Sequence, residues 1–110
     1  MGSLVINQFD VILVNLDPTM GSEVRKTRPC AVISPNEINH QLNTLVIAPL
    51  TSTSKPYPSR VQVESGGRLG WVMLDQIRSV DRQRVTKVLG KLSGNEAISI
   101  KKVMKELFVD

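Results

Sequence analysis

Short apolar runs alternate with polar, turn-forming segments over the first 90 residues of the chain. The β-branched run from Asp10 to Leu16 predicts a strand, which Asp17-Pro18 ends. The polar stretch from Thr19 to Thr27 predicts an exposed connection. Further strands are predicted over residues 29–34, 44–50, 60–64 and 85–89, with one strand or two in 70–80. A helical turn is predicted over 36–42 and a tight turn at 66–67.

The C-terminal segment carries the pattern of an amphipathic helix. Ser93-Gly94-Asn95-Glu96 matches a capping box, in which the serine and glutamate side chains each bind a free backbone N–H. Apolar residues then recur at helical spacing and define one face: Ala97, Ile100, Val103, Met104, Leu107 and Phe108. The lysines point mainly away from that face: Lys101, Lys102 and Lys105. These elements predict a single α+β domain over residues 1–110, a small curled β-barrel on which one helix packs.

The chain is basic, with a formal net charge of +4 and a pI of about 9.6. Residues 55–91 hold eight Lys and Arg against three acidic residues. Such an excess suits a polyanionic partner, of which nucleic acid is the commonest. The same net charge also serves solubility alone, so charge by itself leaves the partner open.

A single cysteine, Cys30, excludes an internal disulfide and is typical of a reducing cytoplasm. It lies in an apolar run, which predicts a buried strand residue. The first ten residues lack the basic start and apolar stretch of a signal peptide. No window approaches the roughly 20 apolar residues of a membrane span. We therefore expect a cytoplasmic protein that does not enter the membrane.

The residue content gives little support to metal, nucleotide or Ser–His–Asp chemistry. The one histidine, His40, lies in a polar stretch, whereas zinc usually takes three or four His, Cys or carboxylate ligands. No spacing singles out a magnesium site from Asp17, Glu23 and Asp75. The glycine-rich run 66–70 lacks the Gly-Lys-Ser/Thr end of a phosphate loop. We expect neither a metal nor a cofactor.

RNA cleavage needs no metal, histidine or cysteine, because the ribose 2′-hydroxyl supplies the nucleophile. The protein must help to remove that proton, stabilise the phosphorane and protonate the leaving 5′-oxygen. An arginine binds two phosphate oxygens at once, a hydroxyl shares the developing charge, and a carboxylate acts as base or holds the arginine. Arg28, Thr51 and Glu23 supply these groups at predicted strand ends and in a loop. Many basic barrels carry such residues at their surface, so composition alone does not decide.

Three segments, in order, resemble the signature of the MazF/PemK toxin family. Residues 16–29 (LDPTMGSEVRKTRP) are similar to the family's Asp-Pro-Thr-x-Gly-Ser/His-Glu loop and the Arg-Pro that opens the next strand. Residues 48–52 (APLTS) resemble its apolar strand ending in threonine. Residues 74–81 (LDQIRSVD) resemble its carboxylate-Gln strand followed by Arg-Ser/Thr-x-Asp. The similarity extends over residues 9–108, nearly the whole chain.

This resemblance implies an SH3-like barrel that forms a homodimer. It implies the toxin of a type II toxin–antitoxin system, an endoribonuclease that cleaves single-stranded mRNA at specific sequences without a metal and so inhibits translation and growth. The products implied are a 2′,3′-cyclic phosphate and a 5′-hydroxyl. It also implies a cognate MazE/PemI-like antitoxin, whose acidic, disordered tail lies across the RNA groove, in keeping with the basic excess.

The resemblance also assigns residue roles by position. Arg28 and Thr51 match the family's catalytic pair, Arg28 binding phosphate and stabilising the transition state, with proton transfer as a further candidate role, and Thr51 donating to the phosphorane. A strand-edge ion pair for Arg28 and a turn hydroxyl for Thr51 would also account for them. Glu23 matches the loop glutamate, a candidate base or orienting group, although a salt bridge with Arg25 or Lys26 would also account for it. The RNA-binding residues implied are Ser22, Arg25, Ser52, Thr53, Asp75 and Gln76.

Two positions depart from some plasmid-borne relatives. Ser22 and Met73 stand where those proteins have a histidine and an arginine with acid–base roles, so the Arg28 and Thr51 version of the mechanism is preferred, and Asp75 as sole base stays open. Two alternative functions have weaker support in the sequence. A gyrase-poisoning toxin of the same barrel acts through a Trp-Gly near its C-terminus, whereas the one tryptophan here, Trp71, is mid-chain. A non-catalytic RNA-binding module is disfavoured by the low aromatic content of 4%.

Overall fold

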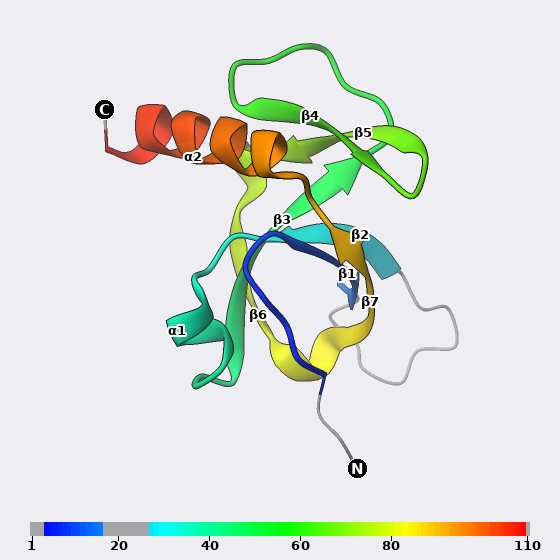
Figure 1. Cartoon of the computed structure of the whole chain (residues 1–110), viewed down its shortest axis with the longest axis vertical. Coiled ribbons are helices and arrows are strands. Elements are labelled where there is room, and N and C mark those ends of the chain that lie inside the picture. The colour runs from blue at the N-terminus through cyan, green and yellow to red at the C-terminus, as the bar shows by residue number, and fades with distance from the viewer. Residues whose placement is uncertain (1–3, 17–26, 110) are drawn as a thin grey trace.

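A curled antiparallel sheet forms the body of the protein, and one long helix lies across part of it (Figure 1). The computed structural model describes residues 4–16 and 27–109. Its strands are β1 (Asp10–Asn15), β2 (Thr27–Val32), β3 (Thr44–Thr51), β4 (Arg60–Ser65), β5 (Arg68–Met73), β6 (Arg78–Asp81) and β7 (Val85–Lys91). The helices are α1 (Asn36–Asn39) and α2 (Gly94–Phe108), with short 3₁₀ turns η1 (Leu74–Gln76) and η2 (Arg82–Arg84).

Strand β3 lies at the centre of the sheet because it has two partners along one edge. Its first half pairs with β6, from Thr44 to Ile47, and its end pairs with β5 at Leu50 and Thr51. Its other edge pairs with β2. The strand order is β4-β5-β3-β2-β1-β7, with β6 beside β3. The sheet curls into a half-barrel, which confirms the predicted mainly-β, SH3-like barrel with a C-terminal helix.

Both faces of the sheet are covered over residues 30–32 of β2 and 45–50 of β3, which explains why these segments are continuous apolar runs. Cys30 of β2 faces one core together with Ile47 of β3. Ala31, the next residue of β2, faces a second core together with Ala48. Ile100 of α2 is fully buried in that second core. Successive residues of β2 and β3 therefore alternate between two cores.

The predicted capping box opens helix α2. Ser93 Oγ accepts from the Glu96 N–H at 3.1 Å, and Glu96 Oε1 accepts from the Ser93 N–H at 2.9 Å. Glu96 Oε2 also accepts from the Glu64 N–H of β4 at 2.7 Å, which ties the helix to the sheet. The predicted apolar face is only partly covered, because Leu107 and Phe108 are 42% and 61% exposed. The last turn of α2 extends beyond the sheet (Figure 1), so the expectation that this whole face packs on the barrel was wrong for those two residues.

Residues 70–80 form two strands, interrupted by η1. The chain departs from the sheet for one turn at η1, before β6 begins. In this turn Leu74 is completely buried and Asp75 is exposed. The predicted turn at Gly66 and Gly67 joins β4 to β5, with φ of 61° and 78°, values that favour glycine. The predicted connection of residues 19–27 lies outside the described residues except for Thr27, which opens β2. No described helix has both the length and the hydropathy needed to cross a membrane.

Candidate functional site

Arg28 and Thr51 lie at the ends of two neighbouring strands, β2 and β3. These strands pair antiparallel, and the last pair on this side is Cys30 with Pro49. Continuing that register two residues past the last pair would set Arg28 opposite Thr51, but Arg28 pairs with Val14 of β1 and Thr51 with Trp71 of β5. Arg28 is exposed and Thr51 half-buried, so the two predicted catalytic residues lie at accessible ends of neighbouring strands.

Cys30 lies on the same face, beneath Arg28. Its thiol donates to the Arg28 carbonyl oxygen at 3.5 Å. Burial raises the pKa of the Cys30 thiol to about 12, against the opposing effect of the positive charges of Arg28 and Arg78. The thiol therefore stays protonated at neutral pH and is a poor nucleophile. The prediction of a buried strand cysteine is confirmed.

Arg78 brings a second guanidinium to this face from β6, and the sequence analysis did not single it out. The β3–β6 register places Arg78 opposite Ile47, which packs in the same core as Cys30. Arg78 is exposed, and within residues 4–16 and 27–109 neither its guanidinium nor that of Arg28 has a hydrogen-bond or ion-pair partner. The apolar Val80 could have indicated the face on which Arg78 lies, because residues i and i+2 of a strand share a face. Val80 is buried in the structure.

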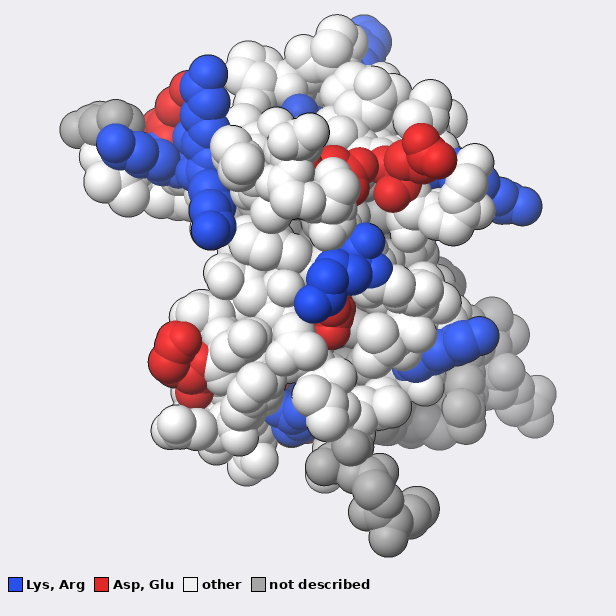
Figure 2. Space-filling view, viewed as in Figure 1, with Lys and Arg blue, Asp and Glu red and all other residues white. Residues whose placement is uncertain are grey.

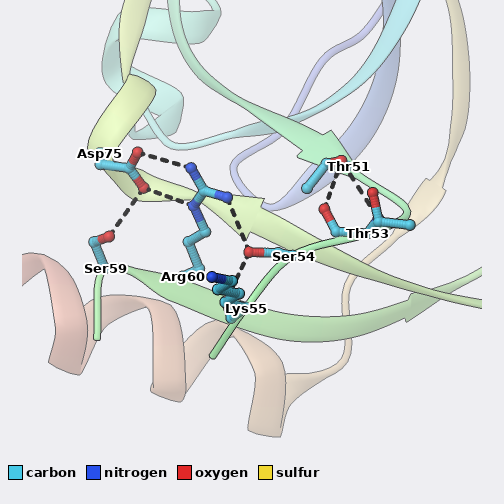
Figure 3. A network of polar contacts seen from close by, with 7 residues as sticks. All are labelled: Thr51, Thr53, Ser54, Lys55, Ser59, Arg60 and Asp75. Atoms are coloured by element: carbon cyan, nitrogen blue, oxygen red, sulfur yellow. Dashed lines mark hydrogen bonds and ion pairs between the residues drawn. The ribbon is translucent and has the colours of Figure 1, made fainter. Parts of the chain in front are cut away.

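The Thr51 hydroxyl is held in a local turn. Its Oγ1 donates to the Thr53 carbonyl oxygen at 3.0 Å and accepts from the Thr53 N–H at 3.4 Å (Figure 3). To donate to a ligand, the hydroxyl must turn away from that carbonyl. Gly70 of β5 lies against Thr51, because a Cβ at Gly70 would come within 3.3 Å of the Thr51 carbonyl oxygen. A side chain at residue 70 would therefore press on the backbone that carries the hydroxyl.

A groove of about 420 Å³ opens beside Thr51 and Ser52. Its walls come from the ends of β2 and β3, the β4–β5 hairpin and β7. The lining is mostly apolar and includes Pro29, Leu69 and Leu89, all of them exposed; Arg68 contributes a positive charge. The groove therefore combines apolar surface with a cation next to the predicted catalytic threonine.

Asp75 is engaged in a polar network (Figure 3). Its two carboxylate oxygens accept from Arg60 Nε at 3.2 Å and Arg60 Nη2 at 3.3 Å, and Ser59 Oγ donates to Oδ1 at 3.0 Å. The hydrogen bonds from Arg60 and, to a lesser degree, from Ser59 hold the pKa of Asp75 below its ordinary value. A carboxylate with a lowered pKa is a weak base, so this geometry disfavours Asp75 as the sole base.

Some of the basic side chains in residues 55–91 donate hydrogen bonds to backbone carbonyl oxygens and so stabilise the fold. Arg82 donates to the carbonyl oxygens of Asn39, Leu42 and Leu4, and Arg84 donates to that of Asn15 at 3.2 Å. Figure 2 shows other basic side chains gathered over α2, whose exposed lysines are Lys101, Lys102 and Lys105. Net charge therefore overstates the number of cations free to bind an anion.

The remaining predicted residues divide into two groups. Ser22, Glu23 and Arg25 lie outside the described residues. Ser52, Thr53 and Gln76 are exposed, the first two directly after Thr51 and the third at the end of η1. His40 is exposed, as expected, with Nε2 3.0 Å from Asn7 Oδ1. Within the described part of the chain, no three His, Cys, Asp or Glu side chains form a group that would hold a metal ion.

Comparison with known proteins gives the family of this chain. A family model described as "PemK-like, MazF-like toxin of type II toxin-antitoxin system" matches residues 7–108. The chain belongs to this family. It is 38% identical over 71 residues to the Endoribonuclease toxin MazF of Escherichia coli (strain K12), a match that spans 64% of each chain. It is 31% identical over 91 residues to Endoribonuclease EndoA of Bacillus subtilis, covering 76% of this chain and 77% of EndoA.

Solved structures with the same fold include two that cover nearly the whole chain. MazF from Deinococcus radiodurans superposes with a TM-score of 0.79 at 27% identity, covering 96% of this chain and 97% of that protein. An endoribonuclease from a Mycobacterial species, solved in complex with its cognate antitoxin, gives 0.82 at 19% identity, with coverage of 96% and 97%. The second likeness concerns the fold alone. The matched region spans just under two thirds of the E. coli toxin, 64% of its length.

Proposed function

We propose that this chain is a metal-independent endoribonuclease, the toxin of a type II toxin–antitoxin pair, which cleaves single-stranded RNA. The observation that supports the proposal is the pairing of β2 with β3, whose register, continued past the Cys30–Pro49 pair, leads toward Arg28 and Thr51 at accessible strand ends. A guanidinium with no partner among the described residues and a hydroxyl at neighbouring strand ends form a site for a single phosphodiester. The names of the relatives in E. coli and B. subtilis support the activity.

The reaction uses the ribose 2′-hydroxyl as nucleophile. The 2′-oxygen forms a bond to the adjacent phosphorus, the bond from phosphorus to the 5′-oxygen breaks, and the products are a 2′,3′-cyclic phosphate and a 5′-hydroxyl. Arg28 binds the phosphate and neutralises the added charge of the phosphorane, and Thr51 donates a hydrogen bond to it. Glu23 takes the 2′-hydroxyl proton. A guanidinium gives up its proton with difficulty, so water protonates the leaving 5′-oxygen.

Polar residues around this pair bind the neighbouring nucleotides. The RNA-binding set proposed is Ser22, Arg25, Ser52, Thr53, Asp75 and Gln76. Ser52, Thr53 and Gln76 are exposed, in keeping with this role. Single-stranded RNA presents its base edges freely, so such side chains select the cleaved sequence by hydrogen bonding. Cleavage of mRNA at those sequences inhibits translation and growth.

The proposed partners are a second copy of this chain and an acidic antitoxin, in the cytoplasm. Exposed apolar side chains support an interface: Leu69, Leu89, Leu107 and Phe108 are each more than 40% exposed. The Mycobacterial relative was solved with its cognate antitoxin, and the D. radiodurans toxin was solved as a MazE–MazF complex. The net charge of +4 favours an acidic partner. Sedimentation of the purified protein tests the dimer directly.

Cleavage of a single-stranded RNA in excess EDTA tests the proposed activity. The purified protein should cut the RNA, and mass spectrometry of the fragments should find 2′,3′-cyclic phosphate and 5′-hydroxyl ends. A matched RNA with one 2′-deoxy nucleotide on the 5′ side of the cleaved bond should resist cutting at that bond alone, because it lacks the nucleophile. Cleavage of the deoxy substrate, or strict dependence on a divalent ion, would refute the mechanism. Binding of RNA without products would identify a non-catalytic RNA-binding module instead.

A further inference from the structure

One guanidinium joins three segments of the chain close to Thr51 (Figure 3). Arg60, the first residue of β4, donates from Nε and Nη2 to both carboxylate oxygens of Asp75 on η1. Its third nitrogen, Nη1, donates to Ser54 Oγ at 2.9 Å. The Arg60 side chain is only 17% exposed. A bidentate Arg–carboxylate pair is among the strongest charge-assisted hydrogen bonds, and partial burial reduces its screening by salt.

The same network fixes the loop of residues 52–59, which leaves Thr51 and has no helix or strand of its own. Ser54 accepts from Arg60 and donates its hydroxyl proton to the Lys55 carbonyl oxygen at 2.7 Å. The Tyr57 ring centroid lies 5.0 Å from Arg60 Cζ, a cation–π distance. Ser59 Oγ donates to Asp75 at 3.0 Å. The loop is therefore held at residues 54, 57 and 59, in each case by Arg60 or by its carboxylate partner.

We propose that Arg60 is a positioning residue for RNA: by bridging Asp75 and Ser54, it holds the loop of residues 52–59 in the conformation that presents Ser52 and Thr53 beside Thr51. This inference rests on the proposed function and deepens it. Arg60 acts through the protein, because three of its five guanidinium N–H groups, one on each nitrogen, donate to Asp75 and Ser54. Asp75 contributes to the RNA site chiefly as the anchor of this bridge.

The geometry predicts an effect on binding more than on chemistry. The backbones of Arg28 and Thr51 belong to paired strands, so the loop affects only the hydroxyl of Thr51, through Thr53. Loss of the bridge leaves the two strands in place but frees the segment after Thr51. Part of the binding free energy of the RNA is then spent on ordering the loop, so affinity falls. An isolated surface ion pair contributes little to stability, but a bidentate pair within a network is the recognised exception. Lysine is an incomplete substitute, because its single ammonium cannot span both carboxylate oxygens and Ser54.

Steady-state cleavage of a fluorescent single-stranded RNA in EDTA tests the proposal, together with amide hydrogen exchange of the free protein. R60M keeps the aliphatic length and removes the guanidinium. It should raise KM about tenfold with kcat within about twofold, and should speed exchange at the amides of Ser54 and Tyr57. R60K should recover part of the loss. K102M removes one positive charge from exposed α2 and is the matched control for general electrostatics.

The proposal is overturned if R60M shifts KM no more than K102M does, or if loop exchange is unchanged in R60M. A fall in kcat with unchanged KM would also overturn it, because Arg60 would then act on the chemical step. If wild-type protein fails to cleave RNA, the proposed function fails. Hydrogen exchange then tests the loop separately. Unchanged loop exchange in R60M would show that Arg60 does not order the loop. Faster exchange would show that Arg60 orders the loop, but the role in RNA positioning would be rejected together with the proposed function.

Discussion

Glu96 links the C-terminal helix to the sheet, and its removal gives a sharp test of how the fold supports the site. Its carboxylate accepts from the Ser93 N–H at 2.9 Å and from the Glu64 N–H at 2.7 Å. Glu96→Ala removes both acceptors. A capping contact contributes about 1 kcal/mol, and a hydrogen bond to an exposed carboxylate contributes about as much. The free energy of unfolding should therefore fall by about 2 kcal/mol.

Urea unfolding followed by circular dichroism measures this change. At an m-value of roughly 2 kcal/mol/M, the midpoint should fall by about 1 M. Glu96→Gln keeps one carbonyl acceptor and should lose about half as much. Glu106→Ala, an exposed position near the end of the same helix, should change stability by less than about 0.5 kcal/mol. Protein concentration is held constant, because a dimer's midpoint depends on it. Equal midpoints for the Glu96 and Glu106 variants would refute the reasoning.

Three further predictions concern the site and its surroundings. Cys30→Ala should retain the cleavage rate, and the native thiol should react with iodoacetamide only through unfolding, since its pKa is about 12; loss of activity in a folded variant would contradict this. Hydrogen bonds from Arg60 lower the pKa of Asp75, so its ion pair stabilises the fold above the unfolded pKa and is lost as pH falls through the folded pKa; the stability gap between wild type and Asp75→Asn should be full at pH 7 and shrink as pH falls through the acidic range, and a constant gap would refute the pairing. Gly70→Ala should slow cleavage, because its Cβ would press on the Thr51 carbonyl oxygen; an unchanged rate in a folded variant would show that this contact is unimportant.

Local signals predicted those features that depend on neighbours in the sequence. The serine and glutamate of the capping box lie three residues apart, and the turn at Gly66 and Gly67 needs only those two residues. The strands from Asp10 to Thr51 followed from their β-branched, apolar composition, because tertiary packing agreed with local propensity. The pairing of Arg28 with Thr51 as a catalytic pair came from the family resemblance and stays a prediction, in keeping with the ends of β2 and β3 lying on neighbouring strands.

Features that depend on contacts distant in the sequence gave no such signal. Arg60 and Asp75 are 15 residues apart and meet because β4 and β5 form a hairpin that ends beside η1. Helical periodicity identified the apolar face of α2, but it cannot say where the sheet beneath ends, so Leu107 was expected to be covered. A charge count likewise cannot distinguish Arg82, which satisfies three backbone carbonyls, from Arg78, whose guanidinium is exposed.

A double-mutant cycle at Arg28 and Thr51 tests the central claim most directly. Single-turnover cleavage of RNA in EDTA is measured for R28A, T51A and the double variant, each shown to be folded by circular dichroism. Each single change should slow cleavage by about 10²–10³, the effect of removing one donor to a developing oxyanion. The double variant should be slowed by much less than the product of the two, because both groups act on the same phosphate. A full cleavage rate in either single variant, or strictly multiplicative losses, would contradict the account.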